Sequence, residues 1–240
     1  MKKTLLICLS LLMVIGISAE TLTLVAEDYA PYVYQKDGVA TGYQVSIAQA
    51  AAKKANVDLK IEFYPWARCL NMVKTGKADG LLGCSKTAER EGFMYYPEVS
   101  MTNEKVVAFG NSFLEKKIKT INDLKSLTVG VVRGYSYGEL FDNDKSIKRD
   151  ESNNLKTMMI KLKNGRFNVA LSDELSAIAM MRELGISNIH ETDLVFSIDP
   201  QYIGFSKTSV NGKIGLEKIG NALKVMKKNG EIENIINNYK

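Results

Sequence analysis

The 240-residue sequence predicts an α/β fold with a parallel sheet and crossover helices. Short apolar segments typical of strands alternate with segments whose apolar residues recur at helical spacing. This alternation is typical of strand–helix–strand units, in which each helix returns the chain to the same edge of the sheet. The length allows one large domain or two small ones.

In the first half of the chain, residues 21–26 (TLTLVA) alternate like a strand. Residues 45–55 repeat apolar side chains at helical spacing, and Asn56 suits the end of that helix. Trp66, Leu70 and Val73 form the stripe of a second helix that ends before Gly76. The small, apolar segment 78–83 then suits a buried strand, and 105–110 (KVVAFG) predicts another strand.

The second half repeats this order. Residues 127–132 (LTVGVV) and 167–171 (FNVAL) predict strands, and a helix is expected from Asn153 between them. A further helix is expected after Ser172-Asp173. We interpret 201–207 (QYIGFSK) as a return crossing, followed by a helical region between Ile219 and Tyr239.

The N-terminus has the pattern of a secretory signal peptide at residues 1–19. Two lysines precede an apolar run from Leu5 to Ile17, and the small residues Ser18-Ala19 follow. No later segment is apolar enough to span a bilayer. We therefore expect an exported protein, the alternative being a retained N-terminal anchor.

Composition and motifs argue against several classes of function. The chain has 32 basic and 27 acidic residues, a balance too weak to indicate a nucleic-acid partner. It has one histidine, no cysteine pairs at zinc spacing, no P-loop and no G-x-G-x-x-G, so we expect no metal and no cofactor. Cys69 and Cys84 are candidates for a disulfide in an oxidising compartment, the alternative being two free buried thiols.

The stretch from Phe63 to Pro97 combines features that suit a bound carboxylate. A buried strand ends there in the hydroxyl residues Ser85 and Thr87 and in Arg90. The guanidinium fork of arginine matches two carboxylate oxygens and keeps its charge at any working pH. Arg90 is a candidate clamp; the alternative is a surface arginine paired with a neighbouring glutamate.

This stretch resembles the bacterial extracellular solute-binding proteins of family 3, which are periplasmic receptors for polar amino acids in ABC importers. The resemblance rests on the aromatic helix start, the small-residue strand, the segment from Ser85 to Arg90 and the aromatic segment ending at Pro97. It extends to Gly42-Tyr43-Gln44-Val45, where Gln44 replaces the usual acid. With the two crossings and the C-terminal helix, it covers essentially the whole mature chain.

The resemblance implies a class II-type periplasmic binding protein with two α/β lobes, a two-strand hinge and a ligand cleft between the lobes. We expect lobe 1 at residues 20–110 and 201–240 and lobe 2 at 111–200. We expect a monomer that is not an enzyme. It would capture a small carboxylate, which we expect to be an amino acid, and deliver it to a membrane-embedded ABC permease. A ligand-sensing module for a membrane receptor is the alternative outside transport.

The resemblance also implies roles for single residues. Arg90 would clamp the ligand carboxylate with help from the helix start at Ser136, and Asp173 would receive the ligand amine. Tyr29 and Trp66 would cover the rest of the ligand, although both could simply belong to the core. The hydroxyls of Ser85 and Thr87 would bind ligand or cap local turns, and Asp173 also suits a helix N-cap.

Residues 134–138 read G-Y-S-Y-G, which matches the G-x-S-x-G motif of serine hydrolases. Asp173 and His190 even follow in the hydrolase order. We favour a capping box from Ser136 to Glu139 instead, because no oxyanion segment of the HGGG type is present and His190 lies in a predicted polar loop. A dehydratase-like enzyme on the same fold is the other enzymatic alternative.

Overall fold

The computed structural model describes residues 20–111, 114 and 117–239. The predicted signal peptide at 1–19 lies outside these residues. In the part of the chain that the structure describes, no helix is long and apolar enough to cross a membrane.

Eight strands form one continuous sheet in the order β4-β1-β5-β11-β7-β10-β8-β9, and β6 pairs with β11 outside this path. On one side the strands are β1 (Glu20–Ala26), β4 (Val57–Phe63), β5 (Gly80–Ser85) and β6 (Met94–Tyr95). On the other side they are β8 (Thr128–Val132), β9 (Lys148–Ser152) and β10 (Val169–Asp173). The two long central strands are β7 (Thr102–Asn111) and β11 (Ile189–Ser206).

The sheet is mixed, which corrects the prediction of a parallel sheet. β1 runs parallel to β4 and β5, and β8 runs parallel to β9 and β10. The crossing strands break this pattern, because β11 is antiparallel to β5 and β7, and β7 is antiparallel to β10. The strand–helix alternation therefore predicts each half correctly but not the long strands that join them.

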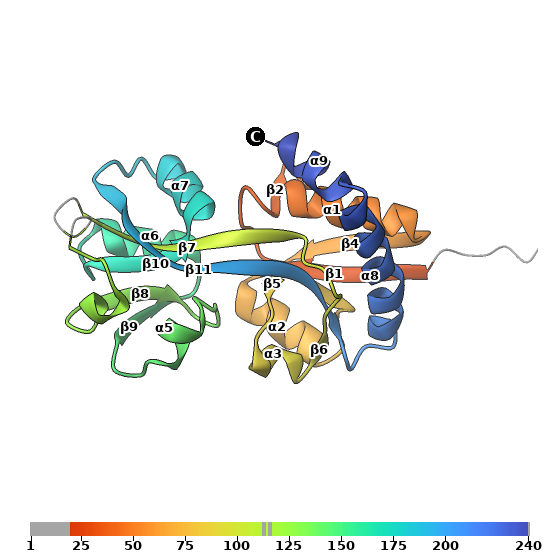
Figure 1. The fold of residues 1–240 in the computed structure, drawn as a ribbon, viewed down its shortest axis with the longest axis horizontal. Helices are drawn as coiled ribbons and strands as arrows, with labels where there is room; N and C mark the ends of the chain where they lie inside the picture. Colours follow the sequence, from red (N-terminus) through yellow and green to blue (C-terminus); the bar gives the residue numbers. More distant parts are fainter. Residues whose placement is uncertain (1–19, 112–113, 115–116, 240) are drawn as a thin grey trace, which may run out of the picture.

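Figure 1 shows two groups of elements connected by β7 and β11. Around β1, β4 and β5 lie α1 (Tyr43–Lys54), α2 (Trp66–Lys74), α3 (Ala88–Glu91), α8 (Gly212–Lys228) and α9 (Glu231–Asn237). Around β8, β9 and β10 lie the 3-10 helix η1 (Ile121–Leu124), α5 (Glu139–Asn143), α6 (Leu155–Lys163) and α7 (Glu174–Glu183). The expected fold of two α/β lobes and a two-strand hinge is confirmed.

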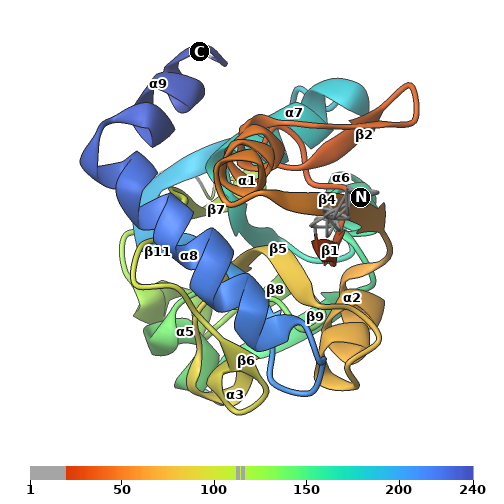
Figure 2. The ribbon, with the colours of Figure 1, turned by 90° about the vertical axis from the view of Figure 1, so that its right-hand side faces the viewer.

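The C-terminal helices pack against the N-terminal half of the chain. Leu223 and Met226 of α8 and Ile232 of α9 are buried in the same hydrophobic cluster as Leu22 and Leu24 of β1. Figure 2 shows α8 beside α1 in this half. Burying this apolar face fixes both ends of the described chain in one core.

The structure also tests two local predictions, the end of the first helix and the position of His190. The helix α1 ends where expected, and Asn56 adopts the left-handed conformation with φ of 53°. His190 lies in β11 opposite Gly110, not in a polar loop. A small hairpin of β2 (Tyr34–Lys36) and β3 (Val39–Thr41), not predicted from the sequence, precedes α1.

Candidate ligand-binding site

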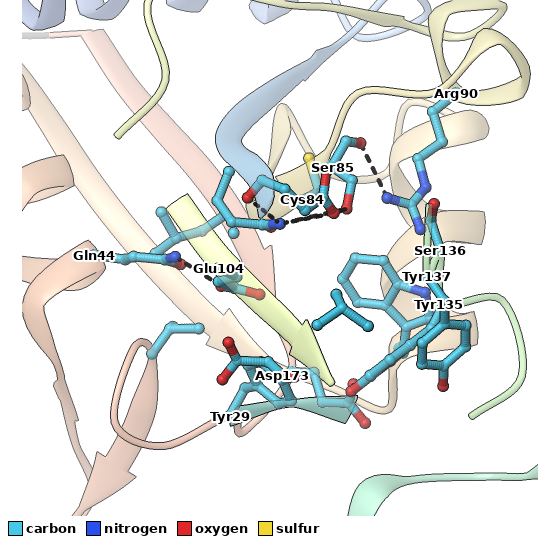
Figure 3. A pocket seen from close by; sticks show the side chains of 18 residues that line it. Tyr29, Gln44, Cys84, Ser85, Arg90, Glu104, Tyr135, Ser136, Tyr137 and Asp173 are labelled. Carbon is cyan, nitrogen blue, oxygen red and sulfur yellow. Dashed lines mark hydrogen bonds between the residues drawn. The ribbon is translucent and has the colours of Figure 1, made fainter. Parts of the chain in front are cut away.

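A cavity lies where the two groups of elements meet, against β7 and β11 (Figure 3). Small-molecule sites often lie at such interfaces between domains. Of the predicted ligand residues, the cavity lining contains Tyr29, Trp66, Ser85, Arg90, Ser136 and Asp173.

Arg90 is buried in the wall of this cavity, with 5% of its surface exposed. Its Nη1 donates to the carbonyl of Ser85 and its Nη2 to the carbonyl of Gly134, both at 3.0 Å. The guanidinium also stacks over the Trp66 ring, 5.1 Å from its centroid. A guanidinium has five N–H donors, so donors remain for a carboxylate in the cavity. The surface ion pair that we considered for Arg90 is wrong.

Arg90 is held in place by the end of β5 and the short helix after it. The Thr87 side chain accepts from the Arg90 backbone N–H and caps α3. Thr87 is not among the residues that line the cavity. The structure therefore gives Thr87 the capping role and leaves it outside the proposed ligand contacts.

Four aromatic side chains line the cavity: Tyr29, Trp66, Tyr135 and Tyr137. Tyr135 meets Tyr29 and Trp66 edge-on, with ring centroids 5.9 and 5.5 Å away. The Tyr135 hydroxyl donates to Glu27 at 2.5 Å. Trp66 belongs to a hydrophobic cluster as well as to the cavity wall, so core and cleft roles coexist. Tyr135 lies inside the G-Y-S-Y-G segment and was missed as a site residue.

Asp173 is 4% exposed and holds two positions at once. Its Oδ1 accepts from the backbone N–H of Ser176, which confirms the predicted N-cap of α7. Its Oδ2 accepts from the Tyr32 hydroxyl at 2.8 Å, across the two halves of the fold. A carboxylate has about four acceptor positions, so two hydrogen bonds leave capacity for an amine.

The loop containing Ser136 does not form the predicted capping box. The helix α5 begins after Gly138 without a side-chain cap. The Ser136 hydroxyl instead donates to Asp142 Oδ2 at 2.7 Å, and Asp142 also accepts from the Tyr137 backbone N–H. No hydrogen bond among the described residues joins Ser136, Asp173 and His190, so the hydrolase arrangement is not assembled.

Cys69 and Cys84 are free, buried thiols, so the predicted disulfide is not formed. The Cys69 thiol donates to the carbonyl of Tyr64 and the Cys84 thiol to that of Tyr202, at 3.3 and 3.7 Å. Burial raises the pKa of Cys69 to about 12 and that of Cys84 to about 11. Cys69 and Cys84 therefore pack as small apolar side chains in the core, which is the alternative that we gave to a disulfide.

Polar residues of β7, β11 and α1 form the floor of the cavity. Gln44, which replaces the acid usual in the family, donates from Nε2 to Thr102 and to Glu104, at 2.9 and 3.2 Å. Asp199 accepts from the Ser85 hydroxyl and from Gln201 Nε2. This floor was not predicted as part of the site.

The cavity carries more acid than base. Four carboxyls line it, those of Glu27, Glu104, Asp173 and Asp199, against the single guanidinium of Arg90. Burial raises the pKa of all four, to about 7 for Glu27 and well above the usual range for Glu104. Neighbouring Asp173 and Asp199 raise the pKa of Glu104 further, while Arg90 opposes the rise at Asp199.

With this fold and site, the chain belongs to the bacterial extracellular solute-binding proteins, family 3, whose model matches residues 22–240. The arginine-binding extracellular protein ArtP of Bacillus subtilis (strain 168) is 25% identical over 213 residues, 87% of this chain and 81% of that protein. The L-cystine-binding protein TcyJ of Escherichia coli (strain K12) is 25% identical over 207 residues, which cover 85% of this chain and 76% of that protein.

Solved structures share the fold. An ancestral arginine-binding protein bound to arginine has a TM-score of 0.78 at 24% identity, covering 91% of this chain and 97% of that one. A histidine kinase sensor domain with similarity to periplasmic binding proteins has a TM-score of 0.80 at 18% identity, covering 90% and 94%. The fold is that of a class II-type periplasmic binding protein.

Proposed function

We propose that this protein captures an amino acid outside the cytoplasmic membrane and delivers it to an ABC permease. The observation that carries the proposal is that Arg90 and Asp173, from opposite halves of the fold, line one cavity together with Tyr29 and Trp66. Arg90 would hold the carboxylate, Asp173 the α-amino group, and the aromatic rings the remaining apolar surface. Ser85 and Ser136, which line the cavity, would accept hydrogen bonds from the ligand, because their hydroxyls already donate to Asp199 and Asp142. The amino-acid ligands in the names of the relatives support this ligand class.

The mechanism would be capture by closure. The two lobes would comprise residues 20–110 with 201–240, and residues 111–200. A ligand that contacts Arg90 and Asp173 at once favours the closed form, because it makes both contacts only there. The two halves are also joined by direct contacts in this structure, such as Trp66 Nε1 donating to the Gly134 carbonyl at 2.8 Å.

The cellular setting is part of the proposal. Residues 1–19 would direct export to the periplasm, and the mature monomer would bind its ligand without altering it chemically. The extracellular family of binding proteins to which the chain belongs supports this placement. Docking on the permease would follow lobe closure, so that only the loaded protein presents the correct surface.

A thermal-shift screen of the mature protein against amino acids and other small carboxylates tests the proposal. A ligand at ~100 times its Kd adds about 2.7 kcal/mol to the free energy of unfolding. For a chain of this size we expect a rise in Tm of roughly 5–10 °C.

The decisive comparison uses two variants of the clamp and one control. Arg90→Ala should remove the shift, and Arg90→Lys should weaken it, because lysine keeps the charge but loses the bidentate fork. Arg68→Ala is the control, since Arg68 is an exposed arginine that stacks on Tyr64. A shift that survives in Arg90→Ala would refute the carboxylate clamp, and no shift with any amino acid would refute the ligand class.

A further inference from the structure

Two acidic side chains face each other on the hinge strands at the floor of the cavity. Glu104 of β7 and Asp199 of β11 are directly opposite in the antiparallel register. Directly opposite residues project to the same face of a sheet, with Cβ atoms about 4.5–5.5 Å apart. Like charges in such a pair are destabilising unless something positive compensates them.

The protein itself supplies little compensation at this position. In the described part of the chain, no lysine or arginine pairs with Glu104, and its hydrogen-bond partner is the amide of Gln44. Lys105, the next residue, pairs with Glu174 instead, at 2.7 Å. Asp199 receives neutral donors from Ser85 and Gln201, and Arg90 is the one basic side chain in the lining.

Gln44 adds an independent sign that a donor is missing. Its side chain is fully buried, and its Oε1 has no hydrogen-bond partner among the described residues. Both donors of its amide are directed to Thr102 and Glu104, which leaves only the carbonyl oxygen unsatisfied. A buried acceptor without a partner costs about 1–3 kcal/mol. Gln44 is also one of the residues that line the cavity, beside Glu104.

The floor therefore offers two carboxyls, which are acceptors when ionised, and one amide oxygen. Ammonium and guanidinium groups only donate hydrogen bonds and carry a positive charge. Such a group would therefore supply the missing donor and offset the negative charge of the carboxylates. An amino acid with a neutral side chain brings no net charge, and would leave the acidic excess of the cavity unchanged.

We propose that Glu104, Asp199 and Gln44 form a subsite for a second cationic group of the ligand, which makes the ligand a basic amino acid. This inference rests on the proposed function, because it assumes that Arg90 and Asp173 hold the carboxylate and the α-amino group. A diamine offers the same two cationic groups but has no carboxylate for Arg90. It is therefore the informative comparison.

Isothermal titration calorimetry of the mature protein with L-lysine, L-arginine, L-glutamine and 1,5-diaminopentane tests this subsite. We expect L-lysine or L-arginine to bind at least about tenfold more tightly than L-glutamine, the difference between a charge-assisted and a neutral set of hydrogen bonds. We expect the diamine to bind more weakly than the basic amino acid, because the clamp is left unused.

Two variants assign the preference to the floor. Glu104→Gln removes the charge but keeps an acceptor for Gln44. Asp199→Asn removes the charge on the facing strand but keeps an acceptor for Ser85 and Gln201. Each should weaken the basic amino acid about tenfold and change L-glutamine less than threefold. Glu217→Gln, on the exposed face of α8, removes one acidic charge outside the cavity lining and should change neither. A melting curve verifies that each variant folds. If one floor variant does not fold, the other serves alone for the comparison.

The outcomes separate the two proposals. If L-glutamine or another neutral amino acid binds as tightly as the basic ones and depends on Arg90, the cationic subsite is wrong while the amino-acid receptor stands. If 1,5-diaminopentane binds as tightly as L-lysine and Arg90→Ala has no effect, the acidic floor stands while the amino-acid function is wrong. Equal weakening of L-lysine and L-glutamine in both floor variants would refute the subsite.

Discussion

Glu27 provides the sharpest prediction about the electrostatics of the cavity. Its side chain is 8% exposed, and burial raises its pKa from 4.5 to about 7. The Tyr135 hydroxyl and the Trp66 backbone only partly offset this burial. Glu27→Gln removes the titration and keeps an acceptor for the Tyr135 hydroxyl.

The sign follows from proton binding. Between pH 4.5 and 7 the folded protein binds more protons at Glu27 than the unfolded chain does, so the free energy of unfolding falls as the pH rises. At pH 8 a pKa difference of about 2.5 lowers the free energy of unfolding by about 3 kcal/mol, because each pKa unit is worth 1.36 kcal/mol. At pH 5 little of this loss has occurred, about 1 kcal/mol.

The assay is differential scanning calorimetry of the ligand-free protein and the Glu27→Gln variant at pH 5 and pH 8. We expect the variant's advantage to grow with pH by about 2 kcal/mol, which is roughly 4–8 °C in Tm for a chain of this size. Glu217→Gln on the exposed face of α8 should show no such growth. An advantage that stays constant between the two pH values would refute the claim that Glu27 is buried in the ligand-free protein.

Two further predictions concern packing and the thiols. Gly212→Ala should lower the free energy of unfolding, measured in urea, by about 2–4 kcal/mol, because the added Cβ would lie 1.8 Å from the Ser206 carbonyl oxygen. Gly220→Ala is the control in the same helix. Its Cβ would make only ordinary contacts, so the change should be neutral or slightly stabilising. Equal effects of the two would contradict this packing. Without reductant, the mature protein should show two thiols when denatured and slow labelling when native, because Cys69 and Cys84 are buried and free; a mass lower by two hydrogens would indicate a disulfide instead.

Much of the fold was predictable because the signals are local. The stripe of Trp66, Leu70 and Val73 predicted α2, and the small apolar segment after it predicted β5. The strand β9 was missed because its sequence, KRDES, is polar and occupies the edge of the sheet. Edge strands with charged residues are common, and such a sequence has no apolar alternation to detect.

The candidate site was predictable only in part. Arg90 follows the buried strand β5 and Asp173 ends the buried strand β10, so their placement could be expected from the order of elements and from the family resemblance. Glu104 and Asp199 could not, because they face each other only through the register of β7 and β11, and the two residues are 95 positions apart in the chain. That pairing depends on long-range packing that no local pattern encodes.

The same side chains that would hold a ligand also join the two halves of the fold. The Gly134 carbonyl accepts from both Arg90 and Trp66, Asp173 accepts from Tyr32, and Glu27 accepts from Tyr135. Replacing one of them changes the population of the closed form as well as the ligand contacts. Because the apparent Kd equals the intrinsic Kd divided by the fraction that is competent to bind, affinity alone does not separate the two effects. The ratio of affinities for two ligands does, because the closed fraction cancels in it, and for that reason lysine and glutamine must be compared on the same variant.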